Sequence, residues 1–283
     1  MLTDSFCLFY ISFSKLTQTS FAHIMMSKGD EYMPIVLLTA LGVGAATVFG
    51  SVLGFLFKKI SHRFSDMVLS FAAGIMLCAA ITGLIMPSLE YEGPAPLATT
   101  IVGIILGALF LNVLDKLVPH LHRLAGAEQE EHPENAKKLS KVLLFVMAIA
   151  IHNLPEGIAA GVGFGGGNNA QALTIAAGIA LQNIPEGMVI IGPMLAAGIS
   201  PGKTFLCAAA TGVIEVIGTF IGYFAVSVSA AILPFALAFA GGTMLYVISD
   251  EMIPETHHND ARGVTYALLA GFCLMLAMSY FLG

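Results

Sequence analysis

The sequence predicts an all-α, polytopic membrane protein with eight transmembrane helices. Of its 283 residues, 57% are hydrophobic and only 11% are charged, far more apolar than an ordinary soluble domain. The apolar residues fall into eight stretches, each long enough to cross about 30 Å of hydrocarbon. Two stretches carry nearly the same polar motif, which indicates inverted repeats. The net charge of -6 says little, because the charges lie in loops and termini, but the lack of a basic stripe argues against nucleic acid as a partner.

Residues 1–33 are predicted to be an N-terminal extension, peripheral or disordered, that precedes the transmembrane domain of residues 34–283. The apolar run 6–13 is too short to span a bilayer, and it lacks the basic start and the cleavage site of a signal peptide. The first transmembrane helix is predicted at 34–57, a stretch without a charged residue.

Spans two to four follow with one long interruption. Span two is predicted over about 67–89 and span three over about 97–119, with the acidic loop EYEGPAP between them. The hydrophilic stretch at about 120–141 is predicted to be a loop. Span four covers about 142–162.

The last four spans complete the domain. The turn GFGGGNN leads to span five at about 172–197, and span six, about 204–229, contains Glu215 near its centre. Span seven begins at about 232 and ends in SDEMIPETHH, and span eight covers about 264–282. An even number of spans places both termini on the same side of the membrane.

The distribution of basic residues predicts which side that is, because Lys and Arg concentrate in cytoplasmic loops. Lys15 and Lys28 lie on the side of the termini. The others lie in the loops of the opposite side: Lys58, Lys59, Arg63, Lys116, Arg123, Lys137, Lys138, Lys141, Lys203 and Arg262. Both termini are therefore predicted outside, with the loop at 120–141 in the cytoplasm.

The two motifs, HNLPEG on span four and QNIPEG on span five, place polar residues in otherwise apolar helices. His152 and Glu156 are four residues apart, as are Gln182 and Glu186, so each pair shares one helical face. A lipid-facing helix has no use for such residues.

Each motif also contains a proline inside the same turn. Pro155 and Pro185 each remove one backbone donor, which frees the carbonyls of Ile151 and Leu181. Freed carbonyls beside polar side chains are good cation ligands, and helices broken near the midplane are typical of secondary transporters.

A set of mid-span polar residues predicts a site for divalent cations. Each carboxylate at the bilayer centre costs about 2.5–3.5 kcal/mol on insertion scales, so a group of them requires an occupant. Imidazole favours zinc and similar metals, and oxygen ligands extend the range toward manganese and cadmium. Two cations could share the site, bridged by two of the carboxylates. The candidate ligands are His152, Asn153, Glu156, Gln182, Asn183, Glu186 and Glu215.

Other interpretations stay open for these residues. Asn and Gln often join helices by hydrogen bonds without any ligand. Met76 in span two could offer a thioether or simply pack, and Asp250 and Glu251 could form an exit relay or be solvated at the interface. An intramembrane metalloenzyme is a second hypothesis, although the sequence has no HExxH motif. A transporter of another solute, with these groups as a proton relay, is a third.

HNLPEG and QNIPEG resemble the signatures of the ZIP (Zrt-, Irt-like protein) metal transporters, particularly the bacterial GufA-like branch. The resemblance extends from about residue 34 to nearly the end of the chain, and includes Glu215 and the DEMIPETHH segment. It implies a ZIP-like fold, a cell (inner) membrane location, a homodimer, and an elevator-like shift of the motif helices. The implied cargo is Zn²⁺, or Cd²⁺, Fe²⁺, Mn²⁺ or Co²⁺, moving into the cytoplasm; no cofactor and no enzymatic activity are expected.

The resemblance also implies a binuclear metal site. One cation would use Met76, His152, Glu156, Gln182, Asn183 and Glu186. The other would use Asn153, Glu156, Asn183, Glu186 and Glu215, with Glu251 on the release path.

Overall fold

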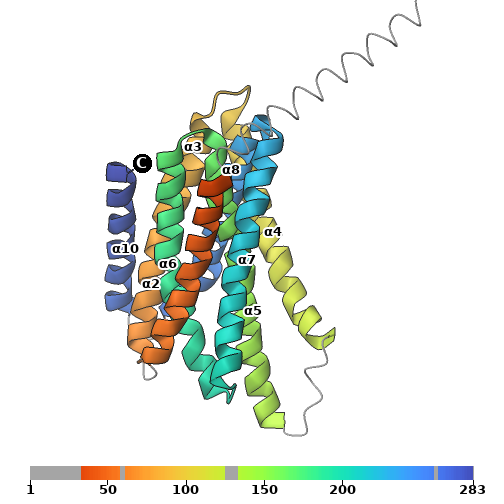
Figure 1. The fold of residues 1–283 in the computed structure, drawn as a ribbon, viewed down its shortest axis with the longest axis vertical. Helices are drawn as coiled ribbons and strands as arrows, with labels where there is room; N and C mark the ends of the chain where they lie inside the picture. Colours follow the sequence, from red (N-terminus) through yellow and green to blue (C-terminus); the bar gives the residue numbers. More distant parts are fainter. Residues whose placement is uncertain (1–32, 58–60, 125–132, 258–260, 283) are drawn as a thin grey trace, which may run out of the picture.

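Long helices form the described part of the chain. The computed structural model describes residues 33–57, 61–124, 133–257 and 261–282, and these residues form helices and turns without a strand (Figure 1). Within these ranges, seven helices are long and apolar enough to cross a membrane. The helix α5 (Pro133–Val162) is an eighth long helix. The predicted all-α, polytopic fold is therefore confirmed.

The helices lie side by side in one bundle (Figure 1). The first helix is Met33–Leu56. The second consists of α2 (His62–Cys78), the π-helical turn η1 (Ala79–Ile85) and α3 (Met86–Glu90). Next come α4 (Pro96–Leu124), α5, the 3-10 turn η2 (Gly163–Gly166), α6 (Asn169–Ala196) and α7 (Pro201–Val228). After η3 (Ala230–Ile232), the seventh consists of α8 (Leu233–Val247), the π-helical turn η4 (Ile248–Met252) and α9 (Ile253–Thr256), and the eighth is α10 (Ala261–Leu282).

The described parts of the predicted loop at 120–141, residues 120–124 and 133–141, are helical. The helix α4 continues to Leu124 and α5 begins at Pro133. The reason is that polar residues do not end a helix by themselves: the start PENAKK places proline at the first turn and good helix formers after it. The first helix begins at the same end of the bundle where α10 ends, and α4 ends at the opposite end (Figure 1). The extension predicted at 1–33 lies outside the described residues except for Met33.

The motif helices pass through their prolines without a break, which differs from the prediction. Pro155 lies inside α5 and Pro185 inside α6. A membrane helix tolerates a missing donor when its neighbours hold it in place. The irregular turns occur instead in η1 and η4, which directly precede the dipeptides Met86-Pro87 and Ile253-Pro254. Such π-helical turns are frequent at functional sites.

The glycine that closes each motif lets two helices touch backbone to backbone. A Cβ atom on Gly157 would lie 2.2 Å from the carbonyl oxygen of Glu215 on α7. A Cβ atom on Gly187 would lie 2.1 Å from the carbonyl oxygen of Thr47 on the first helix. Accordingly, α5 packs against α7 as α6 packs against the first helix.

These contacts extend the repeat beyond the two motifs. A Cβ on Gly50 would meet the carbonyl oxygen of Ile184 at 2.1 Å, and one on Gly218 would meet that of Leu154 at 2.5 Å. Leu154 and Ile184 occupy the same position in their motifs. Gly50 lies three residues after Thr47, just as Gly218 lies three residues after Glu215. The first helix thus matches α7, the sixth span, and α5, the fourth span, matches α6, the fifth. Because successive spans alternate in direction, the two helices of each matching pair run in opposite directions. This arrangement confirms inverted repeats.

Close backbone contacts join the first helix, α5, α6 and α7 into one group, the motif group. Among the other helices they join α2 with α10 and α4 with α8: Cβ atoms on Gly74, Gly271 and Gly107 would lie 1.9 to 2.2 Å from a carbonyl oxygen of α10, α2 and α8, respectively. We call these other helices, α2–α3, α4, α8–α9 and α10, the frame group. Where α6 meets α10, Gly178 faces the side chain of Met275 instead of a backbone. Contacts through flexible side chains allow sliding more easily than contacts between backbones.

Candidate metal site

The seven predicted ligands on α5, α6 and α7 are buried together inside the motif group. His152 and Glu186 are 7% exposed, and the other five are fully buried. Among the side chains that the structure describes, no lysine or arginine is buried. We call these seven side chains together the buried polar layer. Three of them are carboxylates, and a cation would supply a counter-charge to them.

Glu156 and Gln182 join the two motif helices. The Nε2 atom of Gln182 donates a hydrogen bond to Oε1 of Glu156 at 2.8 Å. The contact leaves Oε2 of Glu156 and Oε1 of Gln182 without a partner in the described chain. Each of the two side chains therefore has one oxygen atom available to a cation.

Glu215 lies at the centre of a second group of hydrogen bonds. Its Oε1 accepts from Oγ1 of Thr47 at 2.6 Å and from Nδ2 of Asn153. Its Oε2 accepts from Nδ2 of Asn183 at 2.8 Å. Three other helices thus fix this carboxylate, and one of the fixing residues, Thr47, was not among the predicted site residues.

Four buried oxygen atoms of this layer have no hydrogen-bond partner in the described part of the chain: Asn153 Oδ1, Glu156 Oε2, Gln182 Oε1 and Asn183 Oδ1. Leaving one buried acceptor unpaired costs about 1–3 kcal/mol. Amide and carboxylate oxygens are ligands for divalent cations. One or two cations in this layer would satisfy these oxygens and balance the carboxylates.

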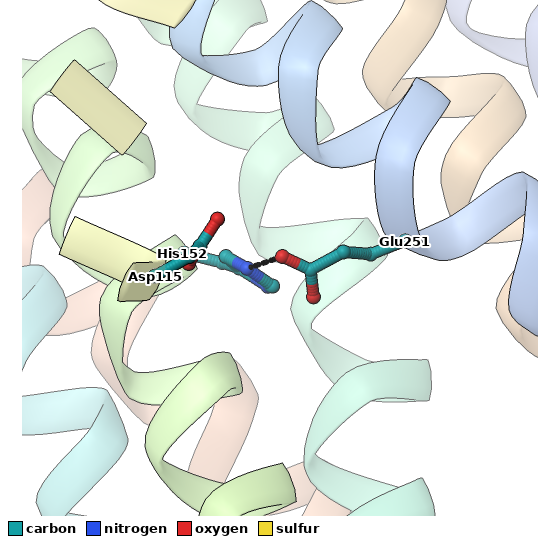
Figure 2. Close-up of side chains that lie close together, drawn as sticks. All are labelled: Asp115, His152 and Glu251. Carbon is teal, nitrogen blue, oxygen red and sulfur yellow. Dashed lines mark hydrogen bonds and ion pairs between the residues drawn. The ribbon is translucent and has the colours of Figure 1, made fainter. Parts of the chain in front are cut away.

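His152 belongs at the same time to a second cluster, the Asp115 cluster, defined by Asp115, His152 and Glu251. Its Nε2 lies 2.6 Å from Oε1 of Glu251 (Figure 2). One ligand atom from each of the three residues lies within 4.8 Å of the other two. Glu251 was predicted and Asp115 was not, although a lone carboxylate near the end of an apolar span was a usable signal.

A cavity of about 250 Å³ leads from the surface to these residues. His152 and Glu186 line it together with Glu251 and Glu255. Because Glu255 is exposed while His152 and Glu186 are buried, the cavity connects the buried layer with the surface near α9. The π-helical turn η4 supplies Glu251 to its wall.

Another cavity, of about 340 Å³, lies toward the other end of α6. Its lining includes Glu90, Tyr91, Gln171 and Ile175 and none of the predicted ligands. Ile175 precedes Glu186 by eleven residues, or roughly 16 Å along a helix. The buried layer therefore communicates with the surface on the α9 side, and not through this second cavity.

Met76 lies in the apolar core of the bundle. It is 1% exposed and belongs to a cluster of buried hydrophobic residues that includes Ile75 and Ile179. This environment favours the packing interpretation over the role of a thioether ligand.

Comparison with known proteins agrees with the geometry. The chain is 37% identical over 254 residues to the zinc transporter GufA of Myxococcus xanthus, covering 87% of this chain and 98% of that protein. It is 38% identical over 252 residues to the zinc transporter ZIPB of Bordetella bronchiseptica, covering 84% and 78% of the two chains. It is 32% identical over 253 residues to the zinc transporter ZupT of Salmonella paratyphi A, covering 86% and 95%.

Residues 122–279 match the family described as ZIP Zinc transporter. That segment contains both motifs, Glu215 and the seventh helix. The similarity to GufA also agrees with the GufA-like branch that the motifs indicated. The chain therefore belongs to the ZIP family of zinc transporters.

Proposed function

We propose that this chain carries Zn²⁺ across the cell membrane into the cytoplasm, with the buried polar layer as its binding site. The observation that supports this most directly is the set of four unpartnered buried oxygens beside three buried carboxylates. A divalent cation supplies both the missing partners and the missing positive charge.

The layer has ligands for two neighbouring cations. His152 and Gln182 would hold the first, and Asn153 and Glu215 the second. Both cations would share Glu156, Asn183 and Glu186, as the family resemblance implies, and Glu156 and Asn183 each have one unpartnered oxygen to offer. Mixed ligands of this kind, without thiolate, give moderate affinity and so permit release.

The Asp115 cluster would receive the ion on its way out. His152 contributes to the buried layer and also contacts Glu251, so the imidazole can pass an ion from one group to the other. Asp115 and Glu251 offer it carboxylate oxygens beside the 250 Å³ cavity. The basic residues of the loops support the assignment of this side to the cytoplasm.

The two helix groups suggest how the ion moves. Hydrogen bonds to Glu156 and Glu215 come from within the motif group, whereas the contact between His152 and Glu251 joins the two groups. A shift of the motif group along the frame group would move the whole binding layer without disturbing it. The resulting carrier would open first on one side and then on the other.

The ligand set does not restrict the cargo to zinc. Carboxylates, amides and one imidazole also suit Cd²⁺, Fe²⁺, Mn²⁺ and Co²⁺, so these ions should compete for the site. We also propose a homodimer, as the family resemblance implies. The hypotheses of a metalloenzyme and of a transporter for another solute are not favoured, because the relatives found are named as zinc transporters.

Uptake of ⁶⁵Zn²⁺ into proteoliposomes tests the proposal. We expect saturable uptake by the wild type, inhibited by excess Cd²⁺, Fe²⁺ or Mn²⁺, and loss of uptake in Glu156→Ala. Unlabelled Zn²⁺ loaded inside the vesicles should accelerate entry of the label, because a carrier exchanges ions and an open channel does not.

The matched control is Glu92→Gln, which neutralises an exposed carboxylate outside the site and should transport like the wild type. Uptake that Glu156→Ala leaves unchanged would contradict the site. Binding of zinc without any uptake would shift the function to a sensor or an enzyme.

Glu215→Gln should impair transport more mildly than loss of the shared ligands. The amide keeps one oxygen that can still accept hydrogen bonds from Asn153 or Thr47, and it removes one negative charge from the second cation only. We expect a rise of about tenfold in the Zn²⁺ concentration for half-maximal uptake, with a changed order of competing ions. A complete loss, like that expected for a shared ligand, would argue against the assignment of Glu215 to the second cation alone.

A further inference from the structure

Thr47 makes a different hydrogen bond from other threonines in the helices. Seven of these return their hydroxyl to a carbonyl of their own helix three or four residues earlier, which is the usual choice for threonine in a helix. They are Thr82, Thr100, Thr174, Thr211, Thr219, Thr243 and Thr256. Thr47 instead donates to a carboxylate of another helix, Oε1 of Glu215, at 2.6 Å.

The main chain of Thr47 is held as firmly as its side chain. Its carbonyl oxygen lies against Gly187, where a Cβ atom would come within 2.1 Å. Thr47 is fully buried. It therefore has little freedom to move, and its hydroxyl points at Glu215 from a position fixed by α6.

The repeat explains why these two side chains meet. Thr47 on the first helix corresponds to Glu215 on α7, because the carbonyl oxygen of each lies against the glycine of a motif. Equivalent positions of two inverted repeats approach each other where the repeats face. The first helix therefore has the hydroxyl of Thr47 at the position where α7 has the carboxylate of Glu215.

We propose that Thr47 is a positioning residue of the metal site, which rests on the function proposed above. An ionised carboxylate has about four lone-pair positions. Thr47, Asn153 and Asn183 occupy three of them on Glu215. The hydroxyl of Thr47 thus fixes the carboxylate so that its remaining position faces the second cation, as supporting residues do at other metal sites.

Two substitutions separate this role from simple packing. Thr47→Val keeps the shape of the side chain and removes the hydroxyl, and Thr47→Ser keeps the hydroxyl and removes the methyl group. We expect Thr47→Val to raise the Zn²⁺ concentration for half-saturation about tenfold, with the maximal rate of uptake little changed, and Thr47→Ser to resemble the wild type. A packing role predicts the reverse order.

A double substitution tests whether Thr47 acts through Glu215. In the Glu215→Ala background, which leaves no side-chain acceptor for the hydroxyl at position 215, Thr47→Val should add less than about a further twofold, because residues that work through one contact are not additive. Thr211→Val is the control. It removes a buried hydroxyl on α7 that donates to the carbonyl of Ala208, and it should leave half-saturation unchanged. Gel filtration and melting temperature verify that each variant is folded.

Saturation is measured both as ⁶⁵Zn²⁺ uptake by proteoliposomes and as ⁶⁵Zn²⁺ bound to purified protein in detergent. Half-saturation that is equal in Thr47→Val and the wild type would overturn the positioning role. So would a full tenfold effect of Thr47→Val on top of Glu215→Ala. A wild type that binds zinc but does not transport it would overturn the proposed function, while the binding data would still decide the role of Thr47.

Discussion

Glu186→Ala should abolish saturable Zn²⁺ uptake while the protein remains folded, and His152→Ala should do the same. Both residues are buried, and both line the cavity that leads to the surface, so an ion must pass them to leave. Loss of Glu186 removes a carboxylate available to both cations. Loss of His152 removes a ligand and also the contact with Glu251.

We expect each substitution to reduce the rate of uptake by more than about a hundredfold, since even residues that only support metal ligands account for 10–100-fold effects. Uptake of ⁶⁵Zn²⁺ by proteoliposomes, normalised to inserted protein, measures this. Glu255→Ala is the matched control, because Glu255 lines the same cavity but is exposed; it should retain uptake within about twofold of the wild type. Normal uptake by both Glu186→Ala and His152→Ala would show that the ion does not use these residues.

Gly157→Val and Gly187→Val should prevent correct assembly of the bundle. Any Cβ at these positions would lie 2.1–2.2 Å from a carbonyl oxygen of the neighbouring helix, well inside van der Waals contact. The helices would have to separate, and the polar layer would separate with them. We expect destabilisation by about 3 kcal/mol or more, the upper range for overpacking.

The melting temperature of detergent-purified protein, followed by size-exclusion chromatography after heating, measures the loss. Gly192→Val is the control, because Gly192 lies on the same helix as Gly187 and a Cβ there would meet nothing within 4 Å. It should melt close to the wild type. If all three variants melted alike, the tight contacts of the motif glycines could not be what holds the two repeats together.

Much of this protein could be predicted from the order of its residues. Long apolar runs cross a bilayer whatever their neighbours are, so the spans were found to within a few residues, except where α4 and α5 extend into the predicted loop at 120–141. The spacing of His152 to Glu156 and of Gln182 to Glu186 is a property of one helix, and it placed these candidate ligands on shared faces, which the structure shows to be buried. The same motifs were sufficient to identify the family.

The contacts between helices could not be predicted in this way. Thr47 and Glu215 are separated by 168 positions, and Asp115, His152 and Glu251 come from three different helices, so nothing in their local sequence indicates that they meet. The local sequence also did not indicate that α5 and α6 would remain helical through Pro155 and Pro185, or that η1 and η4 would form π-helical turns.

By itself, the sequence determined which segments enter the membrane, which residues share a helical face, and which ion chemistry those residues support. Only the tertiary structure decided that Thr47 and two amides fix Glu215, that Asp115 joins His152 and Glu251, and that close glycine contacts join four helices into the motif group. The physical reason is the range of the interactions involved. Hydrophobicity and helical periodicity act over one turn to one span, whereas the partner of a buried polar group depends on which helix packs beside it and at what height.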